Sequence, residues 1–318
     1  GKSHRTNDTS DMLMFNAEEA GIVVKFEKKD TPQKVNIKLF RQGPKDIRLN
    51  DTKISQKELI GTLNTVIFCP EDLQLIKGTP SGRRRFLDME ISQTSATYYH
   101  QLMQYNRLLQ QRNAILKEYR GKQNIPLEEW DLQLADMASF IVKKRLESLK
   151  KINLLIDLMN RKLTGGLENL TIGYEQPYMD NGSLEYTKEG FYERIKAALP
   201  QDRHRMTTSV GPHRDDLRFF SDAMDLKKFG SQGQQRTAVL SLKLSELEFI
   251  KSEVGEYPVL LLDDVLSELD ESRRANLLQF IHKRIQTFIT TTDIHDFKDL
   301  KSVQFISCEG GKVQYGQP

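Results

Sequence analysis

Cysteine is scarce in this sequence of 318 residues, which contains only Cys69 and Cys308. The two are not in metal-ligand spacing, they argue against a disulfide framework, and they suit a reducing compartment. No run approaches the roughly 18 apolar residues that a membrane span needs. The N-terminus is basic but lacks the apolar segment of a secretory signal. We therefore expect a cytoplasmic protein with no membrane partner.

A strong charge of one sign is also missing. The formal net charge is +3 and the pI is near 8.6, which does not by itself favour a nucleic-acid partner. Hydrophobic residues make up 38% and charged residues 29%, so the chain is globular but rich in charge. Its length suits two domains or one elaborated domain.

The sequence divides into three parts, residues 1–81, 82–166 and 167–318. Alternating apolar and polar residues predict β-structure over 21–68, with a turn at 30–33 and a buried strand at 64–68. The middle part predicts an antiparallel arm of two long helices, broken at 121–126 and ended by two glycines at 165–166. Its second helix carries a heptad-like apolar seam. In the last part we expect an amphipathic helix through Leu240, Leu244 and Leu247, strands at 258–262 and 287–291, a helix at 272–284, and a β pair at 303–307 and 312–315.

The stretch YPVLLLDDVLSELD, residues 257–270, carries the strongest chemical signal. Four consecutive apolar residues suit a strand buried on both faces of a mostly parallel sheet. Two carboxylates follow at the carboxyl end of the strand, where such sheets bind ligands. This is the Walker B pattern, in which Asp263 would hold Mg²⁺ through water. Asp264 would orient or deprotonate the attacking water. The alternative is a strand that ends in a solvated acidic turn.

A second stretch, FGSQGQQRTAVLSLKLSE at 229–246, places a glycine-rich turn before a helix. Free backbone N–H groups and the hydroxyl of Ser231 would face an anion there. The alternative is an ordinary capped helix, since serine is a good N-cap. The stretch lies about thirty residues before the acidic strand, and it resembles the LSGGQ motif of ABC-type ATPases. That resemblance implies that Ser231 contacts the γ-phosphate held by a second subunit. It extends the ATP-binding set to Gln232, Gly233 and Gln234.

Longer matches make the resemblance specific. The chain resembles the RecF family of ABC/SMC-type ATPases in KSHRT (2–6), FCPEDLQLIKGTPSGRRRFLD (68–88), GPHRDD (211–216), SQGQQRT (231–237) and LLLDDVLSELD (260–270). The resemblance implies an α/β ATPase head with an inserted helical arm. Residues 1–81 would be the remainder of lobe I, 82–166 the arm, and 167–318 the rest of the head.

The same resemblance implies the cofactors, the partners and further site residues. We expect ATP and Mg²⁺, an ATP-dependent homodimer that clamps double-stranded or gapped DNA, a RecR-type mediator protein, help in loading recombinase, and a nucleoid-associated location. Two carboxylates, Glu71 and Asp72, would form a Q-loop that links the metal site to the arm. Thr292 stands where the wider family has its switch histidine. The dimer-facing D-loop would be Ser267, Glu268, Leu269 and Asp270.

Two departures from the wider ABC pattern predict slow hydrolysis. Asp264 stands where a longer glutamate is usual, and Thr292 replaces a histidine. Both weaken support of the attacking water, so we expect a slow DNA-dependent ATPase that acts as a timing switch.

Gly1-Lys2-Ser3 matches the end of a phosphate-binding P-loop, but the residues after it do not fit one. Residues 4–11 contain no apolar side chain to pack a helix on a sheet, and they are rich in residues that are poor in helix interiors. We expect that GKS is not the P-loop. By the resemblance, the P-loop segment is absent from this chain, and the chain alone is inactive.

Basic clusters suggest contacts to a DNA backbone, which would be independent of sequence and sensitive to salt. For any one cluster the alternative is a solvated helix face. The loop GPHRDD at 211–216 would face the nucleotide or the dimer, or else would be a turn with Arg–Asp pairs. The clusters are Arg83-Arg84-Arg85, Lys143-Lys144-Arg145, Lys150-Lys151 and Arg203-His204-Arg205.

Two other functions stay open at this stage. Without a P-loop, the chain could be a non-hydrolysing scaffold that binds DNA or a protein. It could also be another SMC-like ATPase head. The arm of about 80 residues argues against SMC proteins proper, because their coiled coils run to hundreds of residues.

Overall fold

The computed structural model describes residues 8–120, 126–178, 186–292, 297 and 303–316. An antiparallel sheet begins the fold after a short 3₁₀ turn, η1 (Ser10–Met12). Its strand order is β1 (Glu19–Lys28), β2 (Thr31–Phe40), β3 (Asp46–Leu49), β4 (Thr52–Lys53). Lys29 and Asp30 make the first hairpin turn with φ of 47° and 58°. The turn expected at 30–33 is therefore shorter, because Thr31 already pairs with Lys28.

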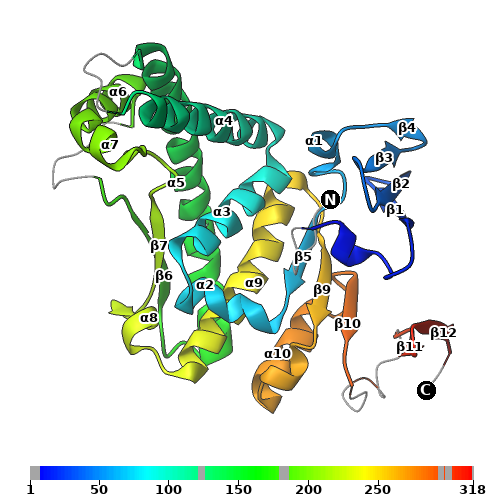
Figure 1. Cartoon of the computed structure of the whole chain (residues 1–318). Coiled ribbons are helices and arrows are strands. Elements are labelled where there is room, and N and C mark those ends of the chain that lie inside the picture. The colour runs from blue at the N-terminus through cyan, green and yellow to red at the C-terminus, as the bar shows by residue number, and fades with distance from the viewer. Residues whose placement is uncertain (1–7, 121–125, 179–185, 293–296, 298–302, 317–318) are drawn as a thin grey trace.

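The helical arm contains three helices in place of the two long ones expected. They are α3 (Pro80–Thr94), α4 (Ala96–Glu118) and α5 (Glu128–Thr164), and Figure 1 shows α4 turning away from α3. The break falls at Ser95, whose backbone is extended and whose hydroxyl accepts a hydrogen bond from the N–H of Tyr98. An N-cap of this kind starts a new helix without glycine or proline.

The apolar seam predicted on the second arm helix is confirmed in α5. Leu149, Ile152, Ile156 and Met159 are all buried. Helix α5 ends at Gly165 in the left-handed conformation, with φ of 67°. It packs against α4, against α6 (Lys188–Ala197) and against α9 (Gln232–Val254). The arm therefore shares its longest helix with the head.

The central sheet is parallel and has the order β10–β9–β5, with β5 (Thr65–Phe68), β9 (Val259–Asp263) and β10 (Thr287–Thr290). The three strands confirm the predicted ones. Helix α9 was expected to be amphipathic, but between Gln235 and Ile250 only Arg236 and Glu248 escape burial. Such a helix lies inside the protein. Helix α10 (Glu271–Ile281) follows β9 through a 3₁₀ turn, η3 (Leu266–Glu268).

The remaining elements complete the layers. A second antiparallel sheet has the order β6 (Leu170–Glu175), β7 (Asp216–Ser221), β8 (Met224–Asp225). The C-terminal hairpin pairs β11 (Ile306–Glu309) with β12 (Lys312–Tyr315). The short helices are η2 (Pro70–Leu73), α1 (Gln56–Leu59), α2 (Gln74–Lys77), α7 (Leu199–Arg205) and α8 (Leu226–Phe229).

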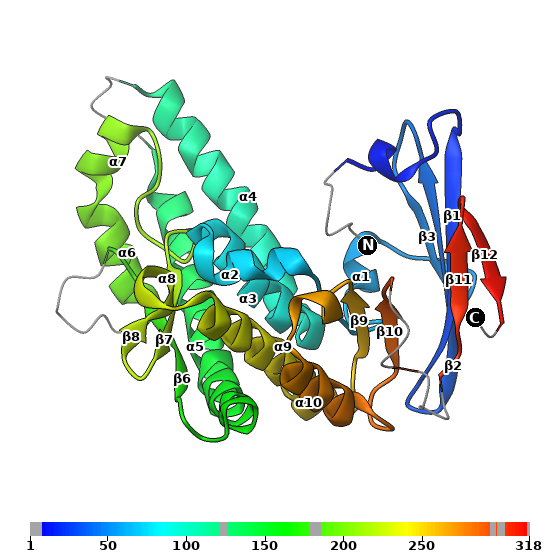
Figure 2. The same ribbon diagram turned by 90° about the horizontal axis from the view of Figure 1, so that it is seen from below.

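In both ribbon views the central sheet lies between the helical arm and the β1–β4 sheet (Figures 1 and 2). Helices α3 and α9 separate this sheet from α4 and α5. Within the described ranges, no helix is long and apolar enough to cross a membrane.

Candidate functional site

An acidic edge lies at the carboxyl end of the central sheet. Strand β9 ends at Asp263, directly beside Thr290 of β10 in the parallel register. The hydroxyl of Thr290 donates to Oδ1 of Asp263 at 2.8 Å and accepts from the N–H of Asp264 at 3.1 Å. Thr290 therefore orients both carboxylate residues. The sequence did not single it out, because the register between two strands is not visible in either strand alone.

The turn after the strand exposes the second carboxylate. Asp264 has φ of 55°, an uncommon left-handed conformation for a residue other than glycine. Its carbonyl accepts from the hydroxyl of Ser267 at 2.8 Å, and its side chain is exposed. The chain thereby turns sharply, and the Asp264 carboxylate is presented to solvent at the edge of the sheet.

The glycine-rich turn at the start of α9 is capped by its own residues. The Ser231 hydroxyl accepts from the N–H of Gln234 at 3.2 Å, and the Gln234 amide oxygen accepts from the N–H of Ser231 at 3.0 Å. Gln234 also donates to Glu168 at 3.1 Å. Ser231, Gln232 and Gly233 are exposed. The structure therefore shows the ordinary capped helix of the alternative interpretation. The first turn of this helix also faces solvent.

Arg273 joins this turn to the predicted D-loop. Its Nε donates to the hydroxyl of buried Thr237 at 2.8 Å, and its Nη1 pairs with Asp270. Asp270 caps α10 by accepting from the N–H of Arg273 at 2.9 Å. Leu269 is buried, whereas Ser267 and Asp270 are exposed. The Thr237 hydroxyl donates in turn to the carbonyl of Gly233 at 2.9 Å. Hydrogen bonds therefore connect Asp264 to Ser267 of the predicted D-loop, and Asp270 at its other end to the first turn of α9.

The Q-loop residues differ from each other in their surroundings. Asp72 accepts from the N–H of Cys69 at 2.9 Å and lies 3.2 Å from the ammonium of Lys243 on α9. Glu71 is exposed. Burial, the largest cause, and the nearby Asp72 charge raise the pKa of the Cys69 thiol to about 12, so this thiol stays neutral. Asp72 thus connects β5 to the interior of the head.

Three further predictions concern Thr292, the metal ligand Asp263 and the Gly1-Lys2-Ser3 sequence. Thr292 is exposed, two residues beyond Thr290. The described residues contain no group of three or more His, Cys, Asp or Glu that could hold a metal. Mg²⁺ usually takes one or two carboxylates together with substrate phosphates, so the single half-buried Asp263 fits that use. Gly1-Lys2-Ser3 lies outside the described residues.

Two arginines of the predicted basic clusters are buried in ion pairs. Arg83 and Arg145 are only 3% and 2% exposed. Arg83 pairs with Asp216 at 2.8 Å, and Arg145 pairs with Asp88 at 2.9 Å. We correct the expectation for these two, because their guanidinium groups are buried in ion pairs with half-buried carboxylates and do not reach the surface.

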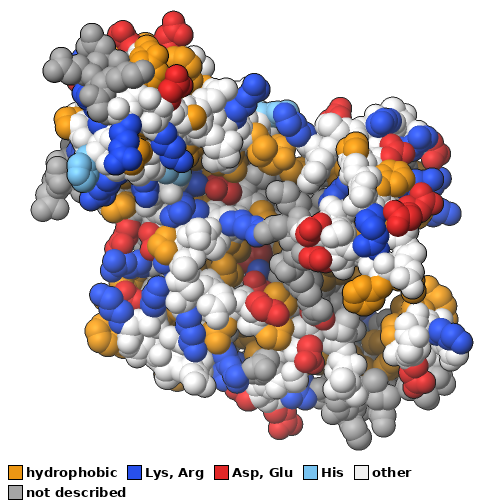
Figure 3. Space-filling model, in the orientation of Figure 1, with side chains coloured by type: hydrophobic (Ala, Val, Ile, Leu, Met, Phe, Trp, Pro, Cys, Tyr) orange, Lys and Arg blue, Asp and Glu red, His pale blue; other side chains and the backbone are white. Residues whose placement is uncertain are grey.

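The other basic residues differ in exposure. Arg84 is half-buried and donates to the carbonyl of Asp215 at 2.7 Å. Arg85, Lys143 and Lys150 are exposed. Two lysines pair locally, Lys144 with Glu147 at 2.7 Å and Lys151 with Glu253 at 2.5 Å. On the face in Figure 3, basic side chains are interspersed with acidic ones.

The loop at 211–216 is a junction between the arm and the β6–β7 sheet. Arg145 donates to the carbonyl of Pro212 at 2.7 Å, and Tyr105 bonds to Nδ1 of His213 at 2.6 Å. Burial lowers the pKa of His213 to about 4 and raises that of Asp215 to about 6. The contacts favour the interpretation of this loop as a turn with Arg–Asp pairs.

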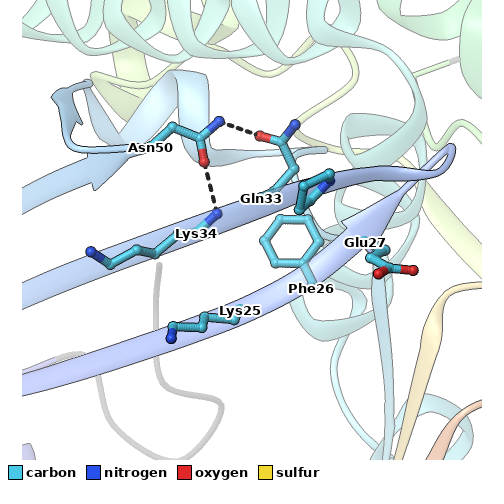
Figure 4. Close-up of a pocket in the computed structure, with 7 residues that line it drawn as sticks. Lys25, Phe26, Glu27, Gln33, Lys34 and Asn50 are labelled. Carbon is cyan, nitrogen blue, oxygen red and sulfur yellow. Dashed lines mark hydrogen bonds between the residues drawn. The ribbon is translucent and has the colours of Figure 1, made fainter.

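A shallow pocket lies elsewhere, on the β1–β2 hairpin. Figure 4 shows Phe26 between Lys25 and Glu27, with Asn50 bonded to Gln33 and to the backbone of Lys34. None of the predicted site residues lines it.

The fold defines an ABC/SMC-type ATPase head. The structure superposes on an Smc head bound to the C-winged helix domain of ScpA with a TM-score of 0.54 over 98% of this chain and 79% of that one, at 14% identity. It superposes on the recombination mediator protein RecF–ATP of the RecFOR pathway with a TM-score of 0.90 over 99% of this chain and 84% of that one, at 34% identity. No family model matches.

Curated relatives identify the family. The chain is 46% identical to the DNA replication and repair protein RecF of Alkaliphilus oremlandii, over 95% of this chain and 83% of the relative. It is 42% identical to that of Halothermothrix orenii, over 94% and 82%. The chain therefore belongs to the RecF family of DNA replication and repair proteins, as the sequence motifs predicted.

Proposed function

We propose that this protein is an ATP-dependent DNA-binding switch. Two subunits would close around ATP and Mg²⁺, the closed dimer would hold double-stranded or gapped DNA, and slow hydrolysis would release it. The observation that carries the proposal is a series of contacts. Ser267 bonds to Asp264, Arg273 bonds to Asp270 and to Thr237, and Thr237 bonds to Gly233 in the exposed turn that begins at Ser231. A structural relative described as RecF–ATP supports the choice of nucleotide.

Each part of this edge has a proposed task. Asp263, oriented by Thr290, would hold Mg²⁺, which would draw charge from the phosphates. Asp264 would orient or deprotonate a water. Ser231 and the free N–H groups of its turn would bind the γ-phosphate of the nucleotide on the partner subunit. Two subunits would close because the nucleotide contacts both only in the closed state.

Slow hydrolysis follows from the same residues. The Asp264 side chain is exposed, and no histidine occupies the position of Thr292. A water held by one short carboxylate is weakly oriented, so the chemical step is slow. The protein would therefore remain closed on DNA for a set time. We extend the proposal to a RecR-type mediator and to recombinase loading, as expected for this family.

The test is the oligomeric state of the protein, measured by light scattering with and without ATP and Mg²⁺. Wild type should dimerise only with both. Ser231→Arg should stay monomeric, because an arginine blocks the turn that meets the partner. Asp264→Asn should dimerise and persist, because water activation is lost but binding is kept.

Gln133→Arg is the matched control, since Gln133 is exposed on the arm helix α5. It adds the same charge and should dimerise like wild type. Dimers that form equally well without nucleotide, or with Ser231→Arg, would refute the proposal and favour a non-hydrolysing scaffold.

A further inference from the structure

A buried lysine lies among three carboxylates where η2, α3 and α9 meet. The ammonium of Lys243 is 3.2 Å from Asp72 and 3.3 Å from Glu246. Glu90 of α3 is the third acid, and its charge acts on Lys243 as well. Lys243, Glu90 and Glu246 are 6%, 4% and 2% exposed. Three elements that are distant in sequence thus share one polar cluster.

The charges in this cluster do not balance. Three ionised carboxylates against one ammonium leave an excess of two negative charges in the interior. Oε2 of Glu90 and Oε1 of Glu246 are fully buried and accept no hydrogen bond from the described residues. Burying carboxylates that outnumber their cation is costly, and such a group takes up a proton instead.

Among the described residues, Lys243 is the one cation whose charge acts on Glu90 and Glu246. Gln93 of α3 donates weakly to Glu90, at 3.5 Å. Lys243 is the cation that the described residues bring to these acids, and it also lies 5.5 Å from the ring of Phe86. Burial, the largest cause, raises the pKa of Glu90 to about 7 and raises that of Glu246. The titratable and charged groups that face the cluster are Cys69, Glu71 and Asp72 beside η2, Glu90 on α3, and Lys243 and Glu246 on α9.

We propose that Lys243 is a positioning residue for Asp72, and that Glu90 and Glu246 hold one proton between them at neutral pH. Because the shared proton neutralises one of the two glutamates, Lys243 faces only one ionised carboxylate besides Asp72 and can hold Asp72 in place. The cluster of Asp72, Glu90, Lys243 and Glu246 therefore links η2 to the arm helix α3 and to α9. Its relevance to nucleotide binding rests on the proposed function, but the shared proton and the position of Asp72 do not.

The first test compares wild type with Glu90→Gln, which mimics the protonated acid at nearly the same size. A carboxyl with a raised pKa favours the folded state at low pH, and this contribution is lost as pH rises. Between about pH 5 and pH 8, urea unfolding should show the folding equilibrium of wild type falling at least tenfold relative to Glu90→Gln. Glu246→Gln should behave similarly, because either residue can carry the proton.

Glu248→Gln is the matched control on the same helix. Glu248 is half-buried and pairs with Arg284 at 3.1 Å, outside the cluster. Its difference from wild type should stay constant over this pH range. The proposal is wrong if Glu90→Gln and Glu246→Gln also differ from wild type by a constant amount.

The second test addresses positioning through charge balance. Lys243→Met should release Asp72, so amide exchange over residues 69–77 should rise at least tenfold. Adding Glu246→Gln removes one of the stranded charges and should restore a large part of the protection. An equal or greater loss in the double variant would show that Lys243 acts only by filling space. These readouts need no nucleotide, so they can fail while ATP-dependent dimerisation succeeds.

Discussion

Arg145 shows how one side chain can organise the contact between arm and head. Its Nε and Nη2 donate to the two oxygens of Asp88 at 3.0 Å each, and its Nη1 donates to the carbonyl of Pro212 at 2.7 Å. The hydroxyls of Tyr98 and Tyr174 lie within 3.2 Å. A planar guanidinium can satisfy several acceptors at once, which an ammonium cannot do. Arg145 thereby ties α5 to α3 and to the loop at 211–216.

We predict that Arg145→Met lowers the free energy of unfolding by about 3–5 kcal/mol, because it strands buried carboxylates. Chemical denaturation measures this loss. Arg218→Met is the control, since the Arg218–Glu175 pair is 41% exposed on both sides and should contribute less than about 1 kcal/mol. Equal losses in both variants would contradict a structural role specific to Arg145.

Thr290 should support ATP hydrolysis, if the protein is the proposed ATPase, because it orients Asp263 and Asp264. Thr290→Val keeps the shape of the side chain but removes the hydrogen bonds to Asp263 and to the N–H of Asp264. Loss of a residue that orients a metal ligand typically costs at least tenfold, so we expect hydrolysis to slow by roughly this factor. A single-turnover ATPase assay measures it. Thr52→Val is the matched control, because Thr52 is exposed on β4 and is not one of the predicted site residues; an equal effect there would contradict a role specific to Thr290.

Helix ends explain much of what the sequence could and could not predict among the elements. Gly165 and the strand before Asp263 were found because their signals are local. The break at Ser95 was missed, because in the sequence a capping serine inside a polar helical stretch resembles any other serine. Arg83 and Arg145 were assigned to the surface, because their acidic partners Asp216 and Asp88 are far away in the sequence. Properties set by distant partners are the ones that local patterns cannot predict.

Alanine substitutions at two glycines should change the stability of the protein in opposite directions. Gly165 ends α5 with φ of +67°, and Gly82 lies within α3; a Cβ at either position would meet no atom within 4 Å. Gly165→Ala should destabilise the protein by about 1 kcal/mol through backbone strain. Gly82 lies in the first turn of α3, and Gly82→Ala should stabilise the protein by about 0.5–1 kcal/mol, because alanine fits the helical backbone and has fewer conformations in the unfolded chain. Denaturation midpoints that move in the same direction would contradict this account of the two helices.

The net charge of the whole molecule, +3, is too small to attract DNA strongly, although DNA binding is part of the proposed function. Any affinity must therefore come from local groups. Lys143 and Lys150 are exposed and lie two turns apart on one face of α5, and Arg85 is exposed on α3. Side chains at this spacing can contact phosphates along one DNA strand.

We predict that affinity for duplex DNA falls steeply with salt, and that each of Lys143→Ala and Lys150→Ala reduces the slope of log K against log salt by about 1. The reason is that each lysine releases about one counterion when it neutralises a phosphate. Fluorescence anisotropy over a salt series measures the slope. Lys53→Ala removes the same charge from a side chain that is 76% exposed in the N-terminal sheet, and its slope should equal that of wild type. If all three variants lose affinity equally, binding depends on net charge, and the surface of α5 is not the contact.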